Sequence, residues 1–302
     1  MPAIPYRLPS TASIYAFSPD NPPALTVPDG AVVDIDTCDC FDDQLRTEAD
    51  TLETLDWEKI NPATGPIYIE GVRAGGVLKV TIESIDVGEQ GVIATGKGLG
   101  VLGDRFEGMT RRYIPFVDGA AVWDDKLSLP LRPMIGVIGV APASGSVGCG
   151  TPGPHGGNMD NKMITAGTTL YLPVFADGGL FACGDLHAVM GDGEVCVAGA
   201  ETPGTVRVRF DFLPALTLAN PVLETDDGFY TIGSAETLDA AVTLAVGDMA
   251  DLLVARLGMA LDDVVMLMSL SGNAQICQVV DPLRTARYLM PKSVLAAYGF
   301  EL

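Results

Sequence analysis

The segment Thr205-Val-Arg-Val-Arg-Phe-Asp-Phe212 alternates apolar and charged side chains after its first residue. Successive side chains of a β-strand point to opposite faces of a sheet, so the valines and phenylalanines would face one way and the charged residues the other. One face of such a strand covers a hydrophobic core and the other meets water. The segment therefore predicts a strand packed over a core.

Further segments extend this β pattern along the chain. Ala31–Cys40 and Val77–Ile85 alternate in the same manner, and Met134–Ala141 is almost wholly apolar, which suits a strand buried on both faces. The 35 glycines and 21 prolines indicate short elements separated by turns. Much of the chain is therefore expected to be β.

Helical patterns are concentrated near the C-terminus. Glu236–Leu257 repeats apolar residues at helical spacing and is followed by Gly258, a residue typical of a helix end. Leu261–Leu270 carries two aspartates in its first turn, and Pro291–Tyr298 begins with a proline. Three helices are predicted there.

These patterns together predict an α+β fold that is predominantly β. We expect a β-rich N-terminal part resembling a sandwich or barrel (residues 1–135), a glycine-rich β part that carries the site (136–215), and an α+β part (216–302). The sequence shows no repeat of fixed period and no low-complexity segment.

The charge of the chain excludes some partners. With 18 basic and 39 acidic residues the net charge is -21, which repels nucleic-acid phosphates and anionic lipid. Nucleic acid is therefore not expected as a partner. No uninterrupted apolar run suits a signal peptide or a membrane helix, so a membrane is not expected either, and a cytoplasmic location is predicted. The six cysteines form no CxxC motif and are expected to be free thiols.

The second of the two histidines lies in Gly179–Val197, which is predicted to be a strand, a tight turn and a returning strand. Asp185 and His187 are two residues apart and would share one face. Asp192 lies between two glycines of the turn, and Glu194 would begin the returning strand. Clustered carboxylates raise one another's pKa unless a cation or proton neutralises them, and carboxylates with imidazole are typical ligands of zinc. The alternative is an ordinary turn beside a half-buried histidine.

The first histidine lies in the loop Gly148–Asp160, where glycines allow a ligand close to the backbone. His155, Asn158 and Asp160 are its polar side chains. No phosphate-binding pattern is present, and such a loop can also exist without a function. Cys149 suggests a thiol nucleophile, but the sequence identifies no base within reach of it.

Several motifs resemble the acetamidase/formamidase family and occur in order from about residue 30 to the C-terminus. Two of them are Gly150–Asp160 and Gly184–Val195. The others are Asp39 with Gln44, Gly65–Gly71, Arg132–Pro142 and Leu170–Val174.

This resemblance implies hydrolysis of a short amide, such as formamide or acetamide, to ammonia and the carboxylate. It also implies a β-rich fold, a homo-oligomer and a bound divalent metal ion, with zinc preferred and calcium as the alternative. The rival interpretations are a non-catalytic, metal-stabilised small-molecule binding protein and an amidase that uses Cys149.

With the family in view, Asp185 and His187 are predicted to hold the ion, together with Asp39 and Asp160. Glu194 is the predicted general base, and His155 and Asn158 are further catalytic residues. The predicted substrate-binding residues are Gly156, Gly157 and Asp192.

Overall fold

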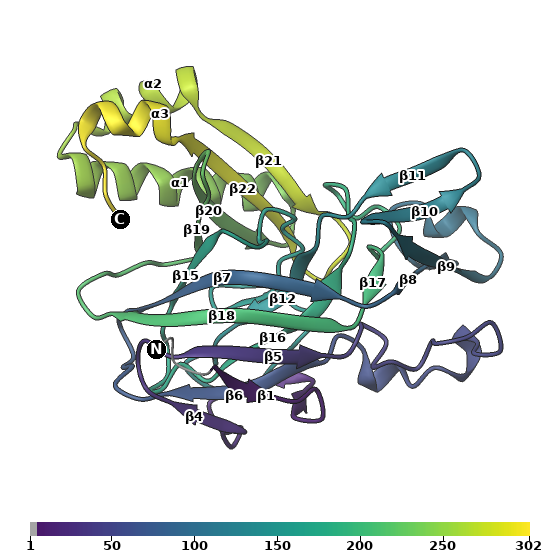
Figure 1. Ribbon diagram of the computed structural model, residues 1–302. Coiled ribbons are helices and arrows are strands. Elements are labelled where there is room, and N and C mark those ends of the chain that lie inside the picture. The colour runs from purple at the N-terminus through teal and green to yellow at the C-terminus, as the bar shows by residue number, and fades with distance from the viewer. Residues whose placement is uncertain (1–4) are drawn as a thin grey trace.

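The computed structural model describes residues 5–302 and is built mainly from two β-sheets (Figure 1). In the first sheet only β1 and β5 run parallel, and the other neighbours are antiparallel. Its nine strands lie in the order β1 (Tyr6–Leu8), β5 (Val32–Thr37), β18 (Gly204–Leu213), β7 (Val77–Val87), β15 (Thr169–Pro173), β19 (Val222–Glu224), β20 (Gly228–Ala235), β22 (Arg284–Pro291) and β21 (Asn273–Gln278).

The second sheet has eleven strands. Its main path is β11 (Leu127–Pro130), β10 (Ala120–Asp124), β9 (Met109–Val117), β8 (Gln90–Gly96), β17 (Glu201–Thr202), β16 (Phe181–His187), β12 (Met134–Gly139) and β14 (Gly156–Asn158). Strand β6 (Ala63–Ile69) pairs with β16 and with two short strands, β2 (Ser13–Ile14) and β4 (Leu25–Val27). A separate pair joins β3 (Ala16–Phe17) to β13 (Val147–Gly148).

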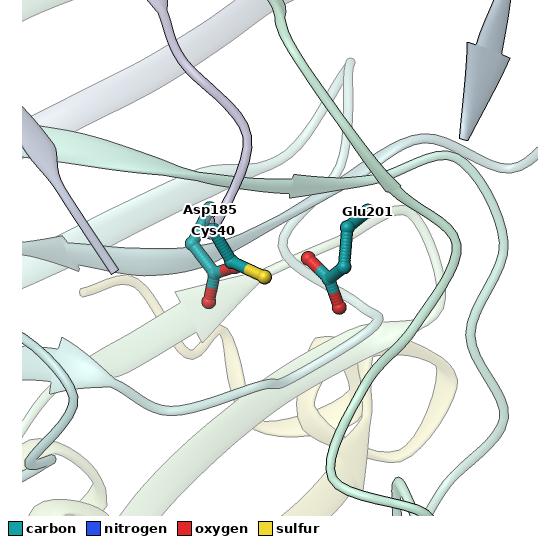
Figure 2. A group of neighbouring side chains, drawn as sticks. All are labelled: Cys40, Asp185 and Glu201. Atoms are coloured by element: carbon teal, nitrogen blue, oxygen red, sulfur yellow. The ribbon is translucent and has the colours of Figure 1, made fainter. Parts of the chain in front are cut away.

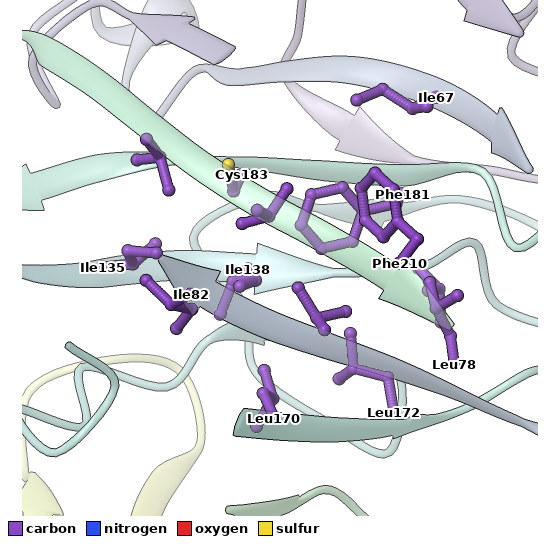
Figure 3. Packing of buried hydrophobic residues seen from close by; sticks show 14 of the residues in the cluster. Ile67, Leu78, Ile82, Ile135, Ile138, Leu170, Leu172, Phe181, Cys183 and Phe210 are labelled. Atoms are coloured by element: carbon purple, nitrogen blue, oxygen red, sulfur yellow. The ribbon is translucent and has the colours of Figure 1, made fainter. Parts of the chain in front are cut away.

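The main hydrophobic core lies between the two sheets (Figure 3). From β18, Val206, Val208 and Phe210 are fully buried, as their alternation predicts. Phe210 meets Phe181 of the opposite sheet edge-on, with ring centroids 4.9 Å apart. The predicted buried strand is also confirmed, since every residue of β12 is buried.

Three α-helices lie at one end of the first sheet (Figure 1), and they confirm the C-terminal helix predictions. The first begins where the Thr237 side chain accepts the Ala240 N–H and ends at Gly258, whose φ is 65°. The helices are α1 (Leu238–Leu257), α2 (Leu261–Ser271) and α3 (Lys292–Leu295), and the short 3-10 helices are η1 (Leu52–Thr54), η2 (Trp57–Lys59), η3 (Gly103–Arg105) and η4 (Ala296–Tyr298).

Helix α1 packs on β20 and β22 and closes a second core. In this core, Met249 and Leu253 of the helix are buried in one cluster with Tyr288 and Met290 of β22. The prediction of a predominantly β, α+β fold is therefore confirmed. The division of the chain into three parts stays a prediction. Strands from all three parts lie in the first sheet. Within residues 5–302, no helix has the length and apolar character needed to span a bilayer.

Gly247 offers a test of the packing of α1. It lies in the exposed part of the helix, and an added Cβ would meet no atom within 4 Å. Because glycine in a helix interior costs about 0.5–1 kcal/mol relative to alanine, we expect Gly247→Ala to stabilise the fold by roughly that amount. Urea unfolding would show a higher midpoint with an unchanged slope. A lower midpoint would mean that α1 packs differently.

Candidate metal centre and active site

His187, the last residue of β16, is surrounded by four carboxylates. Its Nε2 lies 3.1 Å from Glu201 Oε2 and 3.4 Å from Asp185 Oδ1. Asp160 Oδ1 and Glu194 Oε1 are each 3.9 Å from the same nitrogen. All five side chains are buried. We call these five residues the acidic cluster.

Ligand atoms in and beside the acidic cluster form two groups of metal-binding size. Asp160, His187 and Glu194 bring three donor atoms within 4.8 Å of one another. Asp185 and Glu201 do the same with the thiol of Cys40. Figure 2 shows the Cys40 sulfur directed toward the Glu201 carboxylate from the Asp185 side. The two groups are adjacent, because His187 touches both carboxylates of the second.

The backbone of the acidic cluster is unusual. Asp160, Asp185 and Glu194 have φ values of 41°, 56° and 47°, in the left-handed region that residues other than glycine seldom adopt. Such conformations persist where the surrounding structure imposes them and are concentrated at functional sites. The surrounding fold therefore imposes the left-handed backbone at these three residues.

Gly136 in β12 leaves the space that the carboxylates occupy. A Cβ at this position would lie 2.5 Å from Asp185 Oδ2 and 2.6 Å from Asp160 Oδ1. Any larger residue would therefore displace both side chains. Glycine is needed here for close approach rather than for backbone freedom.

Several polar atoms of the site are buried without a hydrogen-bond partner, and these include His187 Nε2 and Glu201 Oε2, which lie 3.1 Å apart but not in hydrogen-bond geometry. They are both carboxylate oxygens of Asp160, Asp185 Oδ1, Glu201 Oε2, His187 Nε2, Asn158 Oδ1 and Asp281 Oδ2. Buried carboxylate oxygens are normally satisfied, since an unpaired buried charge costs several kcal/mol. Their concentration in one place points to a cation as the missing partner.

The pKa values of the cluster reflect the same excess of negative charge. Burial raises the pKa of Glu201 to about 8, with Asp185 adding to the shift while His187 opposes it. Burial and the Asp185 carboxylate raise the pKa of Asp160 to about 6. Burial opposes the charged form of His187, but the carboxylates of Glu201 and Asp185 outweigh it and raise the His187 pKa well above its ordinary value.

A cavity of about 100 Å³ opens onto the acidic cluster. Asp185, Glu194, Glu201 and Asn158 provide polar lining, and Asp281 joins them from the C-terminal part. The apolar lining comes from Cys40, Phe41, Leu52, Trp57, Ile60, Ala94, Leu99, Val197 and Ala198. Ligand pockets of drug size measure about 300–1,000 Å³, so this cavity admits only a molecule of a few atoms.

The returning strand predicted to begin at Glu194 is not formed. After His187 the chain makes a long loop, and the partner strand β17 begins only at Glu201, which lies opposite His187. The loop is held away from β16 because the Gly193 N–H donates to Cys277 O, next to the end of β21. The prediction of a tight hairpin was therefore wrong.

His155 lies apart from the acidic cluster. Its ring packs against Phe17, with centroids 5.2 Å apart, and burial alone lowers its pKa to about 4. The Gly156 N–H donates to Gly153 O, and a Cβ on Gly156 would lie 2.2 Å from Ile138 O. This glycine therefore allows β14 to lie close to β12. Of the loop residues predicted to act in the site, the structure places Asn158 and Asp160 there.

Asp39 and Asp192 also point elsewhere. Asp39 Oδ1 accepts the N–H groups of Phe41 and Asp43, at 2.9 and 2.8 Å. Asp192 forms two hydrogen bonds with Arg287, at 2.9 and 2.8 Å, and lies 3.0 Å from the Lys162 nitrogen. Neither belongs to a metal-sized group among the described residues.

The sequence patterns did not indicate Cys40, Glu201 or Asp281 as residues of the site. Cys40 follows Asp39 directly, and Glu201 precedes the strand Gly204–Leu213 by three residues, so both lie beside segments already singled out. Asp281 has no comparable signal, because only the tertiary fold brings its chain segment to the cavity.

A comparison with protein families shows what the chain as a whole is similar to. The model of the Acetamidase/Formamidase family matches residues 11–148 and 145–294, almost the whole chain. The chain belongs to the acetamidase/formamidase family. The resemblance that the sequence motifs indicated is thereby confirmed.

Solved structures of acetamidase/formamidase proteins have the same fold. A predicted acetamidase/formamidase from Thermoanaerobacter tengcongensis is 49% identical, with 99% of each chain covered and a TM-score of 0.97. An acetamidase from Bacillus halodurans is 43% identical over 97% of this chain and 100% of its own, with a TM-score of 0.95.

Curated members of the acetamidase/formamidase family are more distant. The acetamidase of Mycolicibacterium smegmatis is 27% identical over 65% of this chain. The chain spans 63% and 65% of the lengths of two such relatives.

Proposed function

We propose that this protein hydrolyses a short-chain amide, of the size of formamide or acetamide, to ammonia and the carboxylate with the help of a bound divalent metal ion. The observation that carries the proposal is the acidic cluster, which holds unpartnered ligand atoms and contributes Asp185, Glu194 and Glu201 to the lining of a very small cavity. Related proteins named acetamidase and formamidase support the choice of an amide.

The donor set favours zinc over calcium. One group offers an imidazole with two carboxylates, and the other offers a thiol with two carboxylates. Calcium takes oxygen ligands, whereas nitrogen and sulfur ligands suit zinc. When bound, such an ion polarises the amide carbonyl and lowers the pKa of a water molecule toward neutrality.

The residues around the cavity supply binding and proton transfer. Asn158, whose Oδ1 is buried and unpartnered, would orient the amide nitrogen of the substrate. The apolar wall formed by Phe41, Leu52 and their neighbours would enclose the acyl group and exclude bulk water. Both contacts favour a small, uncharged substrate.

Glu194 is the proposed proton carrier. It lines the cavity, and burial together with the Asp160 carboxylate raises its pKa well above the ordinary value. With a cation in the acidic cluster keeping its carboxylate ionised, Glu194 would take the proton of the water that adds to the carbonyl carbon. Glu194 would then pass the proton to the nitrogen as the C–N bond breaks, releasing ammonia and the acid.

An ammonia-release assay with formamide and acetamide tests this function. The purified protein should release ammonia, chelation should abolish the activity, and Zn²⁺ should restore it. Activity that survives complete metal removal would exclude metal assistance. Absence of activity with metal bound would favour the binding-protein alternative. The cytoplasmic location and the homo-oligomer stay predictions.

Two cysteine variants separate metal binding from thiol catalysis. Cys40 contributes to a metal-sized group, whereas Cys149 is buried with its thiol donating to Ile14 O at 3.5 Å. Because outer partners of metal ligands alone are worth about 10–100-fold in affinity or activity, Cys40→Ser should lower both by at least that range, while Cys149→Ala should change neither. Inactive Cys40→Ser protein with full metal content would instead indicate a thiol nucleophile.

The raised pKa values predict how pH affects the metal-free protein. Glu201 and Asp160 have ordinary pKa values of 4.5 and 3.8, and folding raises these to about 8 and about 6. Between these values the folded state binds more protons than the unfolded state, so stability should fall as pH rises from about 4 to about 8. His187, whose pKa is also raised, acts in the same direction.

Bound Zn²⁺ should flatten this pH dependence, because it keeps the carboxylates ionised and displaces their protons. Urea unfolding at about pH 5 and about pH 8, with and without Zn²⁺, measures the effect. Equal pH slopes in both series would contradict the assignment of Glu201 and Asp160 to the metal centre.

A further inference from the structure

Arg287 of β22 is a fully enclosed cation near the metal centre, with 2% of its surface exposed. Its guanidinium donates two hydrogen bonds to Asp192 and one to Asn161 Oδ1, the last at 3.1 Å. Nε donates to Gln275 Oε1 at 2.7 Å, which fixes the guanidinium against the neighbouring strand β21. One side chain therefore joins three separate segments.

Both loops that Arg287 contacts carry residues of the acidic cluster. Asp192 lies two residues before Glu194, and Asn161 directly follows Asp160. Glu194 and Asp160 are two of the three members of the imidazole-containing group. Both have left-handed backbone conformations, which need support from surrounding structure.

The backbone reinforces the same connection. The Gly193 N–H donates to Cys277 O at 2.8 Å, and Gly193 O accepts the Val279 N–H at 3.2 Å. The segment that carries Glu194 is thus held at two neighbouring residues. Gly193 bonds to the end of β21, and Asp192 bonds to Arg287. Its orientation depends on the C-terminal part of the chain.

We propose that Arg287 is a positioning residue that clamps the Asp160 and Glu194 loops in the geometry that binds the metal. The planar guanidinium matches the carboxylate of Asp192 with two parallel hydrogen bonds while a further N–H reaches Asn161. Lysine offers a point charge and cannot make this set of contacts. The inference rests on the proposed function only in taking the group of Asp160, His187 and Glu194 as a metal site.

Zinc affinity of the metal-stripped protein, measured by competition with a chromophoric chelator, tests the clamp. Outer partners that orient metal ligands are worth about 10–100-fold in affinity, so Arg287→Lys and Asp192→Ala should each weaken Zn²⁺ binding within that range. Arg207→Lys is the matched control, because Arg207 also pairs in a bidentate manner with a carboxylate, that of Asp34, on the first sheet. This control should retain wild-type affinity.

Amide hydrogen exchange of the metal-free proteins gives a second readout that needs no ion. Exchange in residues 190–197 should accelerate in Arg287→Lys and Asp192→Ala, while exchange in β18 should not change. If the folded variants bind Zn²⁺ as wild type does and show no local acceleration, Arg287 only supports overall stability and the proposal is wrong. If wild type binds no divalent ion, the metal part of the proposed function fails, and hydrogen exchange alone decides whether the clamp exists.

Discussion

His187→Ala should lose its bound metal and with it amide hydrolysis. The His187 Nε2 lies within 3.9 Å of all four carboxylates, so its removal would take a donor from one metal-sized group and a neighbour from the other. Loss of an outer partner alone costs about 10–100-fold, and the loss of this ligand should exceed that range. Elemental analysis and ammonia release on the same samples measure the two effects.

His155→Ala provides the comparison for metal content. It also removes a buried imidazole, but one that packs on Phe17 outside the acidic cluster. The folded fraction of this variant should keep its full complement of metal. Retention of metal in His187→Ala, or its loss in His155→Ala, would contradict the ligand assignment derived from the structure.

Gly136→Ala should weaken metal binding without changing any charge. The added methyl carbon would lie 2.5 and 2.6 Å from carboxylate oxygens of Asp185 and Asp160, and 2.9 Å from the Asp185 carbonyl oxygen. The side chains can rotate away, but only by leaving the positions that face His187. We expect at least a tenfold loss of Zn²⁺ affinity, about the lower limit for disturbing the support of metal ligands, and a comparable loss of turnover.

Gly148→Ala is the matched control, since it adds the same methyl group to a strand glycine with no atom within 4 Å of the new carbon. Overpacking costs about 1–3 kcal/mol, so thermal unfolding should show some destabilisation of Gly136→Ala but not of the control. Wild-type metal affinity in folded Gly136→Ala protein would show that the carboxylates do not need their observed positions.

Much of the fold could be predicted because its signals are local. The alternation in Thr205–Phe212 requires only that neighbouring side chains choose opposite faces, and β18 shows that separation. The glycine at Gly258 likewise acts within one helical turn, and α1 ends beside it. The hairpin prediction failed because the bonds from Gly193 to the end of β21 are not encoded near Gly193.

The residues of the site likewise include some that local sequence indicates and others that only the tertiary fold brings together. The sequence by itself placed Asp185 and His187 together, because a spacing of two along a strand brings side chains to one face, and their ligand atoms lie 3.4 Å apart. Only the tertiary structure could add Cys40, Glu201 and Asp281 to the site.

Those additions depend on the register between strands and on the path of long loops. The pairing of β17 with β16 sets Glu201 opposite His187, and the fold of the C-terminal part brings Asp281 to the cavity and Arg287 to Asp192. No periodic pattern records such contacts, since each depends on the packing of segments far apart in the chain. Local chemistry therefore determined the elements and one edge of the site, while long-range packing completed the cluster.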